Sequence, residues 1–236
     1  MDRRMLHGIG GHPVTTHSAE RRFPRYRISL PLLHRPKART ALNVGVGWSR
    51  DLSEGGACVE LAERLRPQRP VRIQIQTDAG PIEAEARVVW RQDPAPAEGG
   101  SLHGVAFTHV APEQLKALRD VIYRKGERGD AGIRLPLEVS VTCQPQGQNE
   151  PPVEGRTGDV GRGGISLRLP TALSPGTTLD LTLHTPHGPL TAQGVVVWVA
   201  PPESQSSERP IPHGLRFTTL GWSTMLSLGL LLADPL

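Results

Sequence analysis

The sequence repeats itself with a period close to 108 residues. Residues 51–90 align without a gap with residues 159–198, and 13 of the 40 aligned positions are identical. Two residue pairs that follow this block also return in the second half: His103-Gly104 and Phe107-Thr108 recur as His213-Gly214 and Phe217-Thr218. A solenoid has a much shorter repeat. In a chain of 236 residues, the repeat therefore predicts two copies of one domain of about 100–120 residues each.

The first copy has the pattern of short β-strands separated by turns. Apolar and polar residues alternate along it, which is typical of strands with one buried face. The expected strands are residues 27–33, 42–48, 57–61, 71–76, 82–90 and 102–109. Six strands at this spacing indicate a closed β-barrel. We expect Trp90 and Trp198, which end the longest strand of each copy, to lie in the core.

A helix is expected after the last strand of each copy. Residues 112–124 begin with proline and place four apolar residues on one face, which should pack on the barrel: Leu115, Leu118, Val121 and Ile122. Residues 222–232 form an almost uncharged segment, and a helix that is apolar on most sides needs burial. This second helix should pack against the other domain or against a second chain, so a homodimer is one candidate assembly.

Two short motifs in the first copy carry groups that suit an anionic ligand. Arg21 and Arg25 form an Arg-x-x-x-Arg pair, and residues 51–56 form an Asp-x-Ser-x-x-Gly turn. An arginine fork can donate two hydrogen bonds to the O6 and N7 atoms of guanine, or pair with phosphate. A carboxylate accepts from the opposite edge of guanine, and glycine lets backbone N–H groups approach an anion. The motifs predict a site for an anionic guanine nucleotide, formed by Arg21, Arg22, Arg25, Asp51, Ser53, Gly55 and Gly56.

These motifs, in this order and ahead of a β-rich segment that ends in His103-Gly104-Val105-Ala106-Phe107, resemble the PilZ domain family. The resemblance covers residues 20–126. It implies a small β-barrel that binds the second messenger cyclic di-GMP through the seven residues named above. It also implies a receptor that changes conformation to regulate a downstream protein partner, rather than an enzyme. The expected fold is all-β dominated, with two tandem six-stranded antiparallel PilZ-type β-barrels, each followed by a short C-terminal helix.

The chain divides into four parts on this interpretation. Residues 1–19 lack periodicity and are expected to form a flexible N-terminal arm. Residues 20–126 form the domain that carries the cyclic di-GMP signature. The polar, glycine-rich residues 127–132 form a linker, and residues 133–236 form the second domain.

The second copy departs from the first at the motif positions. Gly161 stands where the first copy has Ser53. When the second Leu-Pro-Leu sequence, at residues 135–137, is aligned with the first, at residues 30–32, the positions of Arg21 and Arg25 are taken by Gly126 and Asp130. We therefore expect a degenerate PilZ-like domain that keeps the scaffold without the ligand-binding residues.

The distribution of charge favours an anionic ligand in the first half. Residues 1–130 contain 21 Lys and Arg against 15 Asp and Glu, whereas residues 131–236 contain 6 against 8. The excess is too small for general nucleic-acid binding, and an aromatic content of 4% is too low for a broad base-stacking surface. The sequence has no metal-ligand spacing, P-loop or nucleophile–base motif, so we expect no metal, no cofactor and no catalytic residue.

Two alternatives to a cyclic di-GMP receptor remain open. The first is an adaptor for motility or polysaccharide-export machinery in which neither domain binds a nucleotide; the intact arginine set argues against it. The second is a β-barrel that binds nucleic acid through a basic face, against which the modest charge argues. With no signal peptide and no apolar tract long enough for a bilayer, we expect a cytoplasmic protein.

Overall fold

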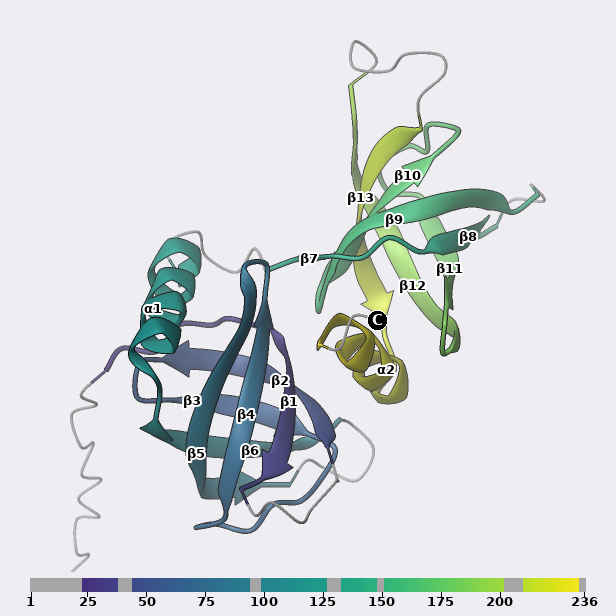
Figure 1. Cartoon of the computed structure of the whole chain (residues 1–236). Coiled ribbons are helices and arrows are strands. Elements are labelled where there is room, and N and C mark those ends of the chain that lie inside the picture. The colour runs from purple at the N-terminus through teal and green to yellow at the C-terminus, as the bar shows by residue number, and fades with distance from the viewer. Residues whose placement is uncertain are drawn as a thin grey trace, which may run out of the picture.

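The computed structural model describes residues 23–37, 44–93, 99–126, 133–147, 151–201 and 210–233. Figure 1 shows two β-barrels joined by a short connection, with one helix after each barrel. The expected N-terminal arm, the linker at 127–132 and the first two arginines of the motif, Arg21 and Arg22, lie outside the described residues.

The first barrel is closed by six antiparallel strands in the order β1-β2-β3-β6-β5-β4. Because the sheet closes on itself, no strand edge is left unpaired. Apolar side chains alternate into its interior, most regularly along the middle of β5. The elements are β1 (Pro31–Pro36), β2 (Gly45–Ser53), β3 (Gly56–Leu61), β4 (Pro70–Thr77), β5 (Gly80–Gln92), β6 (Ser101–His109) and α1 (Pro112–Gly126).

The second barrel has the same plan with one short strand added. Its sheet runs in the order β10-β13-β12-β11-β8-β9-β7, and an additional pairing of β9 with β10 closes six of these strands into a barrel. The fold predicted from the sequence is therefore confirmed. The elements are β7 (Leu135–Pro136), β8 (Ser140–Pro145), β9 (Val153–Gly161), β10 (Gly164–Leu169), β11 (Thr178–Thr185), β12 (Gly188–Val199), β13 (Ile211–Thr219) and α2 (Trp222–Ala233).

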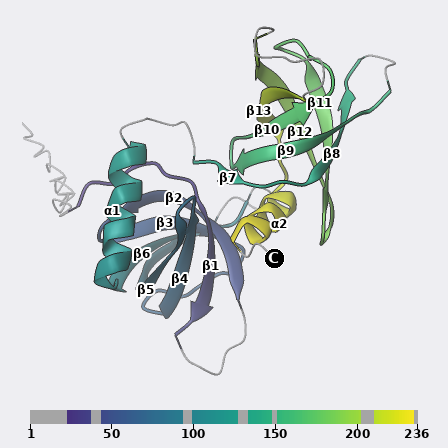
Figure 2. The ribbon, with the colours of Figure 1, turned by 45° about the horizontal axis from the view of Figure 1, so that its top comes forward.

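The two helices have different partners. α1 packs on its own barrel through the buried residues Leu118, Val121 and Ile122. α2 lies between the two barrels in both Figure 1 and Figure 2, and it packs against β1 and β2 of the first barrel. The apolar α2 thus buries itself against the other domain, one of the two arrangements expected from its sequence.

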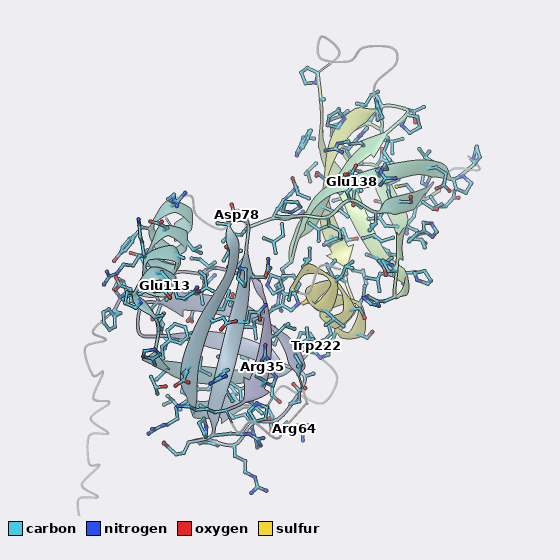
Figure 3. All side chains as sticks on the ribbon, viewed as in Figure 1. Arg35, Arg64, Asp78, Glu113, Glu138 and Trp222 are labelled. Atoms are coloured by element: carbon cyan, nitrogen blue, oxygen red, sulfur yellow. The ribbon has the colours of Figure 1, made fainter. Side chains whose placement is uncertain are left out.

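The contact of α2 with the first barrel depends on two glycines that admit tryptophan rings. Trp48 of β2 is fully buried, and its indole N–H donates to the carbonyl of Met225 at 2.9 Å. A Cβ atom at Gly229 would lie only 2.9 Å from Trp48 Nε1. At the start of α2, Trp222, which is labelled in Figure 3, faces Gly100. An added Cβ at Gly100 would lie 2.2 Å from the Trp222 ring.

The prediction that Trp90 and Trp198 lie in the core is wrong. Their exposed fractions are 39% and 44%. In each barrel the strand register shifts just before the tryptophan, after Val88 and after Val196 respectively. Such a β-bulge turns the following residue to the other face of the sheet. Each indole therefore lies on the outer face of its barrel.

The alignment of the two copies ahead of their second strands is also corrected. Ser49 Oγ accepts from the backbone N–H of Leu30 at 2.8 Å, and Thr157 Oγ1 accepts from that of Val139 at 2.9 Å. Leu30 therefore matches Val139, not Leu135. The shift is four residues, and a slip by an even number leaves every side chain on the same face of the sheet. The apolar alternation could not reveal it.

Candidate functional site

The candidate site lies on the outer face of the first barrel, where the segment before β1 crosses the end of β2. Tyr26 and Leu52 exchange two backbone hydrogen bonds of 2.9 Å, which places Arg25 beside Asp51. Arg25 Nη1 lies 2.8 Å from Asp51 Oδ1, which also accepts from the backbone N–H of Cys58 at 3.0 Å. The two side chains are 28% and 27% exposed. The pair is fixed in position and accessible to a ligand.

The turn between β2 and β3 is shaped by the other motif residues. Ser53 is buried, and its hydroxyl donates to the carbonyl of Gly56 at 3.0 Å. A Cβ at Gly55 would lie 2.7 Å from the ring of Phe23, and one at Gly56 would lie 2.2 Å from the carbonyl oxygen of Val105. Glycine at both positions lets the arginine segment and β6 pack closely against the turn.

Sequence reasoning missed three residues that connect α1 to this turn. Glu54 accepts from Arg119 Nε at 2.8 Å and from the hydroxyl of Tyr123 at 3.0 Å. The Tyr123 ring also meets the edge of Tyr26 at a centroid distance of 6.3 Å. The available signal was the spacing of Arg119 and Tyr123, which are four residues apart and share one helix face. Through these contacts α1 is positioned by the candidate site.

The attachment of α1 should depend on pH. The hydrogen bond from Arg119 holds the pKa of Glu54 below its ordinary value of 4.5. The contribution of this carboxylate to stability is therefore fully present above about pH 4.5 and is lost as the pH falls through the lowered pKa. We expect Glu54→Gln to lower the melting temperature at pH 7 and to have a smaller effect at pH 3, where a larger fraction of the Glu54 side chain is protonated. Thermal unfolding followed by circular dichroism would test this, and equal decreases at both pH values would contradict it.

A row of residues crosses four strands of the first barrel at the level of Asp51. Asp51 pairs with Cys58, Cys58 with Gly104, and Gly104 with Trp90. Residues directly opposite one another in antiparallel strands share a face. A Cβ at Gly104 would lie 2.0 Å from Trp90 Nε1, so the indole covers this glycine. The ion pair and the indole therefore bound a strip of outer face three strand spacings wide, roughly 14 Å.

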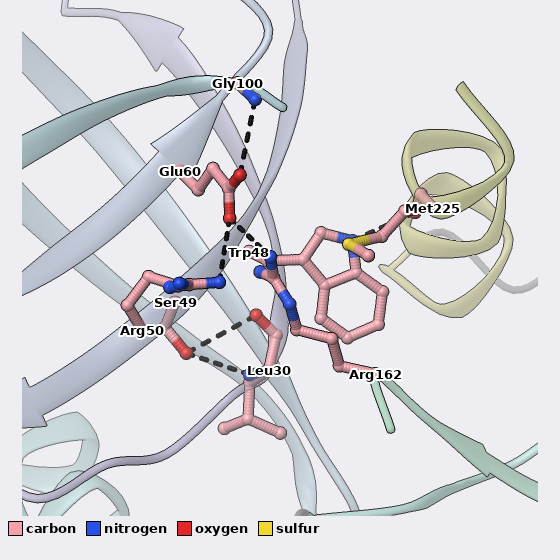
Figure 4. A network of polar contacts seen from close by, with 8 residues as sticks. All are labelled: Leu30, Trp48, Ser49, Arg50, Glu60, Gly100, Arg162 and Met225. Atoms are coloured by element: carbon pink, nitrogen blue, oxygen red, sulfur yellow. Dashed lines mark hydrogen bonds and ion pairs between the residues drawn. The ribbon is translucent and has the colours of Figure 1, made fainter. Parts of the chain in front are cut away.

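The site borders the contact between the two barrels. Glu60 of β3 binds Arg50, which precedes Asp51, at 3.3 Å and Arg162 of the second barrel at 2.5 Å (Figure 4). Glu60 and Arg162 are only 10% and 17% exposed. Burial lowers the pKa of Arg162, and the hydrogen bond to Glu60 opposes that shift. Arg162 lies in the β9–β10 turn at the position that corresponds to Glu54 in the first barrel.

A separate groove of about 530 Å³ lies along β4 and β5, next to the start of α1. Figure 3 labels Arg35 on this barrel and Glu113 at the start of α1, and both line the groove. Its other charged residues include Arg72, Glu83 and Glu85. Because acidic and basic groups are mixed along the groove, it offers no excess of positive charge to an anionic ligand.

Two further features, a metal site and a membrane-spanning helix, are absent from the described residues. They contain no group of three or more His, Cys, Asp or Glu side chains placed to bind a metal ion. Both helices in this part of the chain also fall short of the length and apolar character that crossing a membrane requires.

Comparison with known proteins shows that both halves of the chain match the same family model. The PilZ domain family model matches residues 19–124 and again residues 123–225. No curated protein matches the chain. Similar solved structures include the PilZ domain of YcgR from Escherichia coli with c-di-GMP, at 20% identity and a TM-score of 0.39, covering 46% of this chain and 92% of that one.

Two of the similar solved structures span most of the chain. MotI/DgrA, an inhibitor of motility from Bacillus subtilis, is 12% identical with a TM-score of 0.36, covering 87% of this chain and 94% of that one. PlzA from Borreliella burgdorferi, in complex with c-di-GMP, is 11% identical with a TM-score of 0.37, covering 86% of this chain and 87% of that one.

Proposed function

Because the chain belongs to the PilZ family, we propose that its first barrel is a receptor for cyclic di-GMP. The observation that carries this proposal is the Arg25–Asp51 pair, which stays accessible on the outer face of the barrel. The turn from Ser53 to Gly56 follows Asp51 in the chain, and Phe23, two residues before Arg25, packs on Gly55. The proposed ligand-binding residues are Arg21, Arg22, Arg25, Asp51, Ser53, Gly55 and Gly56.

The chemistry of the pair matches the two edges of guanine. The Arg25 fork can donate to O6 and N7, while Asp51 accepts from the N–H groups on the opposite edge. In the proposed complex, Arg21 and Arg22 contribute the charge that balances the phosphates. Ser53 keeps the turn in the shape that presents Asp51, because its hydroxyl already donates to Gly56.

Trp90 extends the proposed site. Its exposed indole shares the outer face with Asp51, and an aromatic side chain offers a stacking surface to a base. We expect Trp90→Ala to weaken cyclic di-GMP binding by about 1–3 kcal/mol, or roughly 5- to 150-fold. Trp90→Phe keeps a stacking ring and should retain most of the affinity. Isothermal titration calorimetry on both variants would test the role, and unchanged affinity in Trp90→Ala would rule out stacking.

Binding at this site would affect two contacts, one that joins the site to α1 and one that joins it to the second barrel. The part of the arginine segment that the structure describes is already bonded to β2 through Tyr26, so the signal need not come from ordering it. Glu54 connects the turn to α1, and Arg50, the neighbour of Asp51, shares Glu60 with Arg162 of the second barrel. In our proposal, ligand binding shifts α1 or the second barrel and so exposes a surface to a downstream protein partner.

A titration of the full chain with three ligands tests the function. We expect saturable binding of cyclic di-GMP at micromolar concentrations, and much weaker binding of GTP and of a short single-stranded oligonucleotide. Preferential binding of the oligonucleotide would support the nucleic-acid alternative. If the folded chain binds none of the three, the adaptor alternative is the better explanation.

A further inference from the structure

The corrected alignment of the two barrels uncovers an arginine in the second barrel that corresponds to Arg25. Leu135 pairs with Val160 as Tyr26 pairs with Leu52, so Arg134 takes the place of Arg25. Arg134 Nη1 lies 3.4 Å from Asp159 Oδ1, and the two side chains are 35% and 44% exposed. The second barrel thus retains the arginine–aspartate pair of the first.

The row that leads from the aspartate to the tryptophan is retained as well. Ser166 Oγ accepts from the backbone N–H of Asp159 at 2.8 Å, Ser166 pairs with Gly214, and Gly214 pairs with Trp198. Trp198 is 44% exposed, and a Cβ at Gly214 would lie 1.8 Å from its Nε1. The second barrel therefore presents a guanidinium, a carboxylate and an indole on its outer face, in the same layout as the first barrel.

Two differences limit what this second surface can hold. Gly161 replaces Ser53, so the turn lacks the hydroxyl that closes it in the first barrel. Arg162 is directed to Glu60 of the first barrel and is therefore engaged away from a ligand. At the corrected shift of 109 residues, Asp130 and Ala131 also stand where the first copy has Arg21 and Arg22, so the charge that would balance phosphates is missing. The surface therefore offers contacts to one planar base rather than a full set of contacts to a base and its phosphates.

We propose that the second barrel carries a second, weaker site for the guanine base of a guanine nucleotide. The proposal rests on the proposed function for the chemistry of the first site. Arg134 donates to O6 and N7, Asp159 accepts from the opposite edge, and Trp198 stacks on the base. Adenine has an amino group in place of O6 and no N–H at N1, so it mismatches both polar groups. We expect the second site to bind at least roughly tenfold more weakly than the first, because it offers fewer charge-assisted contacts.

The test is the number of binding events in the full chain. Equilibrium dialysis with cyclic di-GMP should give two classes of site in the wild-type chain. Arg25→Ala should weaken the tight class roughly 10- to 150-fold and leave the weak class unchanged, whereas Arg134→Ala should remove the weak class and leave the tight class unchanged. Trp198→Ala should weaken the weak class roughly tenfold. Arg156→Ala, which removes an exposed arginine of β9 paired with Glu138, is the matched control and should leave both classes.

Each pattern of results decides between the two sites. A single class of site that Arg25→Ala weakens and Arg134→Ala leaves unchanged overturns the second site and leaves the proposed function standing. One class that is abolished by Arg134→Ala alone overturns the proposed function and supports the second site, and no binding overturns both. Dialysis of the Arg25→Ala variant with GMP and with AMP tests the base, and equal affinities would overturn the assignment to guanine.

Discussion

Arg25→Ala is expected to weaken cyclic di-GMP binding by about 1.5–3 kcal/mol, which is roughly 10- to 150-fold. The variant removes the fork that would donate to guanine and leaves Asp51 without its 2.8 Å partner. Asp51 still accepts from the backbone N–H of Cys58, so the turn should keep its shape. Calorimetric titration would measure the loss, with circular dichroism as the check on folding.

Two control variants separate geometry from charge. Arg27→Ala removes an equal charge from an exposed position two residues away, and it should weaken binding much less. Arg25→Lys keeps the charge but loses the planar fork, so its affinity should fall between those of Arg25→Ala and the wild-type chain. If Arg25→Ala and Arg27→Ala had equal effects, Arg25 would act only through the general positive field of the segment.

The sequence predicted the barrels because their determinants are local and repeated. Alternation of apolar residues, frequent turns and the repeat after residue 51 indicate the number of strands and their places along the chain. The two errors have physical causes that local patterns cannot show. A four-residue slip preserves the faces of a strand, so it concealed the match of Arg25 with Arg134. A bulge after Val88 reverses the faces without a distinct sequence mark, so Trp90 was assigned to the core.

The site was only partly predictable for the same reason. Arg25 and Asp51 were found because they belong to a motif with known spacing. Glu54 and Arg119 were not found, because their contact depends on where α1 lies in space. The Glu60–Arg162 pair joins positions 102 residues apart on different barrels, where no local periodicity applies. The contacts between the barrels could therefore be identified only from the structure. The sequence indicated only that the apolar helix α2 packs against a partner.

Gly229→Leu is expected to separate α2 from the first barrel. Even a Cβ at this position would lie 2.9 Å from Trp48 Nε1 and 3.3 Å from a methyl group of Val46, so a leucine cannot fit without movement. Overpacking of this kind costs about 1–3 kcal/mol. The change would also separate the Trp48 indole from the Met225 carbonyl that accepts its hydrogen bond. A buried indole without its acceptor is unfavourable, which adds to the destabilisation.

The readout is the fluorescence of Trp48, which is fully buried in the docked state. In a background with Trp90 and Trp198 replaced by phenylalanine, the emission comes from Trp48 and from Trp222, which both pack at the contact of α2 with the first barrel. Gly229→Leu should shift this emission to longer wavelength and lower the melting temperature. Ser227→Ala, on an exposed position of the same helix, is the matched control and should leave both unchanged or slightly raise stability.

Glycine is normally a poor helix residue, so Gly229→Ala would stabilise an undocked α2 but strain a docked one. A higher melting temperature for Gly229→Ala, with unchanged emission, would show that Trp48 and α2 are not packed as described. A lower one would mean that glycine at position 229 is required because the two barrels meet there.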